Sequence, residues 1–417
     1  MKKIRYLFSV LLLGAFLCSL VLGCKNNSSP DESPKQEPST QLTDEEFIEE
    51  FIEGYELGEA KVVRTKESSA MKAYIIIYPS KDPYGEDIML SAVISVSTTI
   101  TADNPAKGLV LYNHATINKA TECPSRGDLG EQAMIATFFP VITVSPDYYG
   151  FGCTEKEHQA YCIGAANAQA SVDALLAAKK LLPELGYSEY GDKLFNLGYS
   201  QGGQTTMAVL KLVTQKYKDD ITITKTFAGA GPYDLETFYE TFLSRDWVSM
   251  PSAVIDVLYA YNEFGKLDIP LNKLFTDKII EDFNEWFESK KYSSAEIGVH
   301  LASLNLTKDK IFAADVLDKD SEVSKKLQAE FKKDSILNDW TPAADESIYL
   351  YHHKEDETVP VATTEALEAF LKENGLGDST LTVYIDEETP ASNYSYHAAG
   401  IAPFLVAVQS QAKELLK

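Results

Sequence analysis

The segment LFNLGYSQGGQTTMAVL, residues 194–210, places a serine between a run typical of a buried strand and a helix-forming run. Gly198 and Gly202 flank Ser200 in a Gly-x-Ser-x-Gly pattern. Because glycine has no Cβ, the chain can turn tightly there while neighbouring elements approach closely. A strand, such a turn and a helix project the serine hydroxyl above the edge of a sheet. The pattern therefore predicts an α/β architecture in which Ser200 is a nucleophile.

Strand-like and helix-like segments alternate through most of the chain. The sequence is typical of early antiparallel strands at residues 70–79 and 87–97. Further strands are expected at residues 108–115, 141–147, 193–200, 221–230, 347–353 and 380–386. Helices are expected at residues 159–182, 204–217, 363–375 and 398–416. This alternation predicts a mostly parallel sheet flanked by helices on both faces.

The middle of the chain follows a different pattern, with helical segments and no convincing buried strands between residues 233 and 340. Strand and helix patterns then resume. We therefore expect an inserted helical cap over a two-part core. The predicted bounds are 45–232 for the first part of the core, 233–340 for the cap and 341–417 for the second part.

The N-terminus has a basic start, an apolar run and a small residue before Cys24, which is typical of an export signal. The ending LVLGC resembles the lipobox of bacterial lipoproteins. That resemblance implies that residues 1–23 are a lipoprotein signal peptide and that Cys24 is lipidated, which would anchor the protein in a membrane. Residues 24–44 then form a flexible tether. We expect a lipid-anchored protein of the bacterial cell envelope, outside the cytoplasm; an uncleaved membrane anchor is the alternative.

The chain is strongly acidic, with a formal net charge of −24 over 417 residues. Removing the leader also removes three basic residues and takes the net charge to −27. Repulsion from phosphates argues against a nucleic acid partner, and the acidity is interpreted as a solubility device. With 45% hydrophobic residues, a sizeable core is available.

Three cysteines remain after Cys18 leaves with the leader and Cys24 is lipidated: Cys123, Cys153 and Cys162. An exported protein can form one disulfide among them. Cys153 and Cys162 are the closest pair in sequence, although sequence does not establish the geometry of a bridge. Three buried, reduced cysteines are the alternative.

A serine nucleophile requires a base, normally a histidine whose tautomer is fixed by a carboxylate. His397 lies after the last expected strand and before the terminal helix, from where it can reach Ser200. The acid is expected after the strand that follows the cap. Three carboxylates are available there: Glu355, Asp356 and Glu357. We assign Asp356 because the shorter carboxylate is common in this role, and interpret the two glutamates as a solvated turn.

A tetrahedral intermediate needs two hydrogen-bond donors for its oxyanion. The first is expected to be the backbone N–H of Gln201, directly after the nucleophile. The second is expected at the end of the strand at residues 108–115, from Ala115 or Thr116, with His114 shaping the loop.

Five segments, GYSQGG, YNHAT, SPDYYGFG, NDWTP and HKEDETVP, together resemble the α/β-hydrolase superfamily, and most closely its secretory lipase and esterase branch with a helical cap. The resemblance covers most of the chain from about residue 70 to the end. It implies the α/β-hydrolase fold, a triad of Ser200, Asp356 and His397, and hydrolysis of a small-molecule or lipid ester through an acyl-enzyme without a cofactor. YNHAT departs from the His-Gly pattern common in such enzymes, so Ala115 would be strained if its position required a positive φ.

Two other functions stay open on the sequence. A serine peptidase of the same fold would use the same triad, because a triad does not distinguish esters from amides. A surface binding lipoprotein could keep the fold without catalysis. His352 and His353 lie beside three carboxylates, but no zinc-site spacing is present, so no metal is expected. The tryptophans of the insertion either line an acyl pocket or form the core of the cap; they are Trp247, Trp286 and Trp340.

Overall fold

The computed structural model describes residues 42–127, 130, 132, 134–135, 139–389 and 395–417. The predicted signal peptide, Cys24 and most of the predicted tether lie outside these residues. The chain divides into two compact units, Met1–Phe51 and Ile52–Lys417, and helix α2 (Asp44–Glu53) belongs mostly to the first. All elements described below belong to the second unit. No helix in the described residues is both long enough and apolar enough to cross a membrane.

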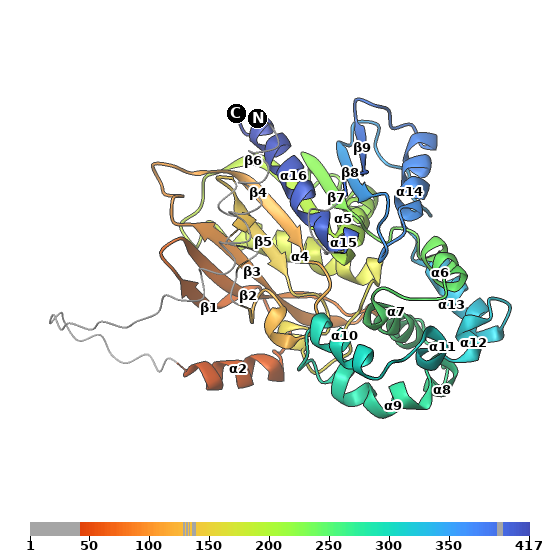
Figure 1. Cartoon of the computed structure of the whole chain (residues 1–417). Helices are drawn as coiled ribbons and strands as arrows, with labels where there is room; N and C mark the ends of the chain where they lie inside the picture. Colours follow the sequence, from red (N-terminus) through yellow and green to blue (C-terminus); the bar gives the residue numbers. More distant parts are fainter. Residues whose placement is uncertain (1–41, 128–129, 131, 133, 136–138, 390–394) are drawn as a thin grey trace. The chain divides into compact units, whose positions relative to one another are not determined.

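In the described part of the chain, nine strands form one sheet in the order β1-β2-β3-β5-β4-β6-β7-β8-β9 (Figure 1). The strands are β1 (Lys61–Glu67), β2 (Met71–Lys81), β3 (Asp87–Ser97), β4 (Ala106–Asn113), β5 (Ile142–Pro146), β6 (Tyr190–Tyr199), β7 (Lys225–Gly229), β8 (Ile348–His353) and β9 (Leu381–Asp386). The pairs from β1 through β3 to β5 are antiparallel, and those from β5 through β4 to β9 are parallel. The expectation of a mostly parallel sheet with early antiparallel strands is confirmed.

Helices flank both faces of this sheet. They are α4 (Gly164–Leu181), α5 (Gln201–Leu212), α14 (Ala362–Glu373), α15 (Tyr396–Ala399) and α16 (Ile401–Leu415). Side chains alternate between the faces along each strand. On β6, Leu194 therefore joins the cluster that contains α4, α5 and α14, whereas Phe195 and Leu197 join the cluster that contains α16. These two clusters are the main core of the sheet domain.

The segment between β7 and β8 is helical and packs largely on itself. Its helices are α6 (Leu235–Ser244), α7 (Pro251–Phe264), α8 (Leu271–Leu274), α9 (Asp277–Phe283), the π-helical turn η4 (Asn284–Glu288), α10 (Ser294–Ser303), α11 (Lys308–Ile311), α12 (Ala314–Leu317) and α13 (Glu322–Lys333). Apolar side chains from these helices form a separate hydrophobic cluster, which Trp286 borders. Trp340 packs in the main core instead, and Trp247 is 53% exposed. We call these helices the cap.

Three local expectations differ from the structure. Strand β1, at the edge of the sheet, was not expected, because none of its residues is fully buried and its sequence lacks an apolar run. Helix α4 begins at Gly164 rather than at residue 159, because Cys162 has a left-handed backbone with φ 55° that an α-helix does not contain. The terminal helical segment is divided at Gly400 into α15 and α16.

All three thiols are free and buried, so of the two alternatives that the sequence left open, the reduced cysteines are correct. The Sγ of Cys153 lies 3.4 Å from the carbonyl oxygen of Met89, whereas Cys162 belongs to the hydrophobic cluster of the cap. The two closest cysteines in sequence therefore have different surroundings. Burial raises the pKa of all three thiols, that of Cys153 to about 12, so they should react poorly.

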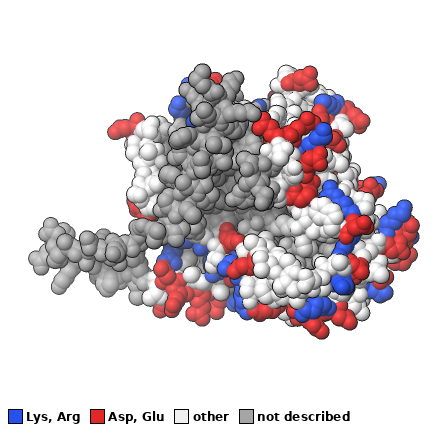
Figure 2. All heavy atoms as spheres, in the orientation of Figure 1, with Lys and Arg blue, Asp and Glu red and all other residues white. Residues whose placement is uncertain are grey.

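Figure 2 shows Asp and Glu side chains spread over the described part of the viewed face, with Lys and Arg among them. Several opposite charges are paired in the cap, including Lys273 with Asp315 and Lys278 with Asp282. On this face the acidity is therefore distributed rather than gathered in one patch, as expected of charge that keeps a protein soluble.

Candidate active site

Ser200 occupies the sharp turn between β6 and α5. Its backbone has φ 58° and ψ −124°, which is strained for a residue with a side chain, and its N–H donates to the carbonyl oxygen of Gly229 at 2.8 Å. A Cβ on Gly198 would lie 2.2 Å from the carbonyl oxygen of Gly202, and one on Gly202 would lie 2.1 Å from that of Asn113. Glycine is therefore required at both positions, and the turn has the geometry of a nucleophile elbow.

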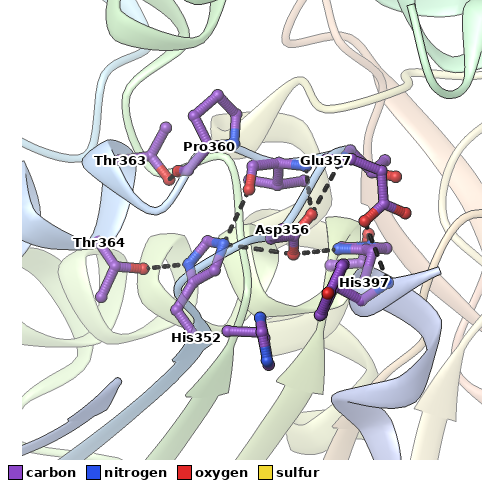
Figure 3. Close-up of polar contacts among 12 residues, drawn as sticks. His352, Asp356, Glu357, Pro360, Thr363, Thr364 and His397 are labelled. Atoms are coloured by element: carbon purple, nitrogen blue, oxygen red, sulfur yellow. Dashed lines mark hydrogen bonds and ion pairs between the residues drawn. The ribbon is translucent and has the colours of Figure 1, made fainter. Parts of the chain in front are cut away.

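Three side chains from distant parts of the sequence meet at this turn. His397, at the start of α15, has its Nε2 2.9 Å from Ser200 Oγ and its Nδ1 2.6 Å from Asp356 Oδ2. Asp356 lies in the turn after β8 (Figure 3). Because an ionised carboxylate only accepts hydrogen bonds, Nδ1 carries the ring proton and Nε2 is free to accept the serine proton. This is the arrangement that activates a serine hydroxyl for attack.

The Asp356 carboxylate is buried and fully engaged. Its Oδ1 accepts the backbone N–H groups of Thr358 and Val359, each at 2.8 Å, and its Oδ2 faces His397 and His352. Burial alone raises the pKa of Asp356, but the charge of His397 and the hydrogen bonds from both histidines outweigh it and hold the pKa well below its usual value. Asp356 is therefore ionised at neutral pH.

Two further residues hold the backbone around His397. The Tyr199 hydroxyl donates to the carbonyl oxygen of His397 at 2.7 Å, and the two rings lie 5.4 Å apart. Glu357 Oε2 accepts the N–H of Tyr396 at 3.0 Å. Glu355 is exposed, as expected, but the interpretation of Glu357 as solvated is wrong, because its carboxylate is partly buried and bonded to the start of α15.

The predicted oxyanion donors lie around the same turn. The N–H of Gln201 is the first of α5 and has no acceptor within the helix. Thr116 lines the cavity that contains Ser200 and Gln201, whereas Ala115 does not. Ala115 is not among the residues with positive φ, so the strain considered for it is absent. The His114 ring contacts the carbonyl oxygens of the loop residue Ala115 and of Asp147, at 2.7 and 3.1 Å, and so fixes this loop.

The cavity beside Ser200 has a volume of about 50 Å³ and lies between the elbow and the cap. One wall comes from α6 and α7 and is mainly apolar; it includes Leu235, Phe238, Phe242, Val254 and Val257. The exposed Trp247 also lines the cavity, and the Arg245 guanidinium lies 5.6 Å from the centre of its ring. Of the cap tryptophans, Trp247 alone is a lining residue of this cavity in the described structure.

The described residues contain no group of His, Cys, Asp and Glu arranged to hold a metal ion.

Some contacts around the candidate triad were not predicted from the sequence. His352 and His353 are buried, and His352 contacts the candidate acid. Chain position offered a signal for these neighbours, since Tyr199 precedes the nucleophile, Glu357 follows the acid and His352 comes four residues before it. Which side chains turn inward, however, depends on the loop conformations.

Comparison with known proteins identifies the fold. No family model and no curated protein matches the chain. Among solved structures, a ligand-bound form of the rice cell wall degrading esterase LipA from Xanthomonas oryzae is 18% identical with a TM-score of 0.71, covering 86% of this chain and 98% of that one. Candida antarctica lipase A is 15% identical with a TM-score of 0.56, covering 79% and 77%. The chain therefore has the α/β-hydrolase fold.

Proposed function

We propose that the protein is a serine hydrolase that cleaves carboxylic esters through an acyl-enzyme. The observation that carries this proposal is the continuous contact from Ser200 to His397 to Asp356 at a strained elbow that opens on a cavity. The likeness in fold to an esterase and a lipase supports the choice of ester over other substrates.

The geometry supports the following steps. Ser200 Oγ attacks the ester carbonyl while His397 Nε2 takes the hydroxyl proton, and Asp356 stabilises the imidazolium that forms. The N–H groups of Gln201 and of Thr116 or Ala115 would bind the oxyanion. His397 then gives the proton to the leaving alcohol, and the C–O bond to the alcohol breaks. Water, deprotonated by His397, attacks the acyl-enzyme and releases the carboxylic acid and the free serine.

The cavity suggests the class of acyl group. Its apolar wall from α6 and α7 favours a hydrocarbon chain over a charged group. Its volume of about 50 Å³ favours short acyl chains over the long chains of storage lipids. The proposed substrates are therefore short-chain esters.

The test is a series of p-nitrophenyl esters from acetate to palmitate, given to the full chain in detergent with Ser200→Ala as control. We expect kcat/KM to be highest for the short esters and to fall at least about 1,000-fold in the variant. Equal hydrolysis by Ser200→Ala would reject the mechanism. A maximum at palmitate would reject the proposed chain length alone.

We also propose that Cys24 is lipidated and anchors the enzyme in the bacterial cell envelope, outside the cytoplasm, where it would meet ester substrates. The lipobox-like LVLGC supports this proposal. Metabolic labelling with an alkyne-bearing palmitate should mark the protein, and Cys24→Ser should abolish the label. Equal labelling of the variant would reject lipidation at Cys24.

A further inference from the structure

A second histidine lies against the candidate acid. His352, near the end of β8, is fully buried, and its Nε2 lies 3.3 Å from Asp356 Oδ2 and 2.9 Å from the carbonyl oxygen of Val359. Its Nδ1 lies 2.6 Å from the Thr364 hydroxyl on α14 (Figure 3). The ring therefore connects a helix of the core to the carboxylate that orients His397.

The hydrogen-bond partners assign the protons of this ring. Because the Val359 carbonyl can only accept, Nε2 of His352 must carry a proton. This N–H donates to the Val359 carbonyl, with Asp356 Oδ2 beside it 3.3 Å from Nε2, and the Thr364 hydroxyl can donate to Nδ1. All ring contacts are satisfied in this form. At 3.3 Å, the contact of Nε2 with Asp356 Oδ2 places the partial positive charge of this N–H beside the carboxylate.

We infer that His352 is a positioning residue that orients the Asp356 carboxylate toward His397. The inference rests on the proposed function, because His352 would act through Asp356 and would not touch the substrate. Asp356 Oδ1 is already held by two backbone N–H groups, whereas Oδ2 has the two histidines. Without the N–H of His352 beside it, buried Oδ2 would keep only the contact with His397, and His397 would be held less firmly in its productive tautomer.

The neighbouring His353 offers a matched control. It is also buried on β8, but its Nε2 faces the carbonyl oxygen of Glu388 at 2.9 Å and its Nδ1 accepts the N–H of Glu355 at 3.0 Å. Within the described residues, its ring makes no hydrogen bond to the Asp356 carboxylate. A loss specific to His352 would therefore separate carboxylate positioning from the general effect of removing a buried histidine.

The experiment compares wild type, His352→Leu, His352→Gln and His353→Leu as full chains in detergent. We expect His352→Leu to lower kcat for p-nitrophenyl butyrate about 10- to 100-fold, with KM within about twofold. The labelling rate of Ser200 by diisopropyl fluorophosphate should fall by the same factor. His352→Gln keeps an N–H donor and should recover most of the rate, and His353→Leu, whose ring packs on Tyr396, should lower kcat clearly less than His352→Leu does.

A wild-type rate in folded His352→Leu, or equal losses in the Leu and Gln variants, would overturn the inference. If His352→Leu does not fold, Thr364→Val, which removes the donor to Nδ1, takes its place and should lower kcat at least about threefold; a wild-type kcat in that variant would overturn the inference.

A spectroscopic readout separates this inference from the proposed function. The downfield proton NMR signal of His397 Nδ1–H reports the contact with Asp356 even if wild type hydrolyses no ester. We expect the signal to persist in His352→Gln and to shift or vanish in His352→Leu. An unchanged signal in both variants would overturn the inference, whatever the activity.

Discussion

A buried carboxylate in the cap should make the protein less stable as the pH rises. Asp256 lies on α7, is 6% exposed, and accepts a hydrogen bond from Asn118 Nδ2 at 2.7 Å. Burial, which the Asn118 hydrogen bond offsets only in part, raises the pKa of Asp256 from 3.8 to about 7, and the negative charge of Glu288 adds to the rise. Asn118 lies in the loop after β4, two residues after Thr116, which lines the cavity beside Ser200. This contact therefore joins the cap to that loop.

The sign and size of the effect follow from proton binding. The native state holds the Asp256 proton more tightly than the unfolded chain does, so this group's contribution to stability declines as pH rises above 3.8 and levels off above about 7. At about 1.4 kcal/mol per pKa unit, the decline between about pH 5 and about pH 8 is on the order of 3 kcal/mol. An uncharged side chain of the same shape at this position would not cause this decline in stability.

The perturbation is therefore Asp256→Asn, measured by urea unfolding of the full chain at about pH 5 and about pH 8. At each pH, the free energy of unfolding of wild type is subtracted from that of the variant. We expect this difference to be about 2–3 kcal/mol larger at about pH 8 than at about pH 5. Asp103→Asn, at an exposed turn, serves as the control and should show no such change. A difference between Asp256→Asn and wild type that is equal at the two pH values, or that shrinks at the higher one, would refute the reasoning.

Three further outcomes are expected. Tyr199→Phe removes the hydrogen bond to the His397 carbonyl and should lower kcat about tenfold with little change in KM, as steady-state kinetics would show. Gly202→Ala would place a Cβ 2.1 Å from the Asn113 carbonyl oxygen and should lower the free energy of unfolding by about 3 kcal/mol or more, measured by urea unfolding; a loss under about 1 kcal/mol would contradict the close packing. The three buried cysteines should resist iodoacetamide in the native protein and react in urea, which peptide mass spectrometry can follow; rapid native alkylation of any of them would show that its burial is wrong.

Much of the fold could be predicted because its core strands carry strong local signals. The apolar run before Ser200 and the helix-forming run after it predict β6 and α5, although α5 begins three residues earlier than expected because it starts directly at the elbow. Edge strand β1 could not be found in this way, since pairing with β2 rather than its own apolar residues determines its conformation.

Only the part of the site that follows from the order of elements along the chain could be predicted. Ser200, Asp356 and His397 were assigned from the elements that precede them, and the structure brings the three together. The contacts of His352 with Asp356 and of Glu357 with Tyr396 depend on the turn that follows β8, which no periodicity records. The sequence left the disulfide open for the same reason, because nearness in sequence does not set the direction of a side chain; the structure shows three free thiols.

The insertion of the cap between β7 and β8 has a consequence for how such a protein can change. The cap helices are stabilised by a hydrophobic cluster of their own, and residues of α6 and α7 also form one wall of the cavity beside Ser200. Under the proposed function, substitutions on that wall should alter which acyl group fits without moving the reacting atoms. One contiguous stretch of the gene therefore encodes this wall, and chimaeras that exchange the stretch between relatives offer a direct test of the proposed ester preference.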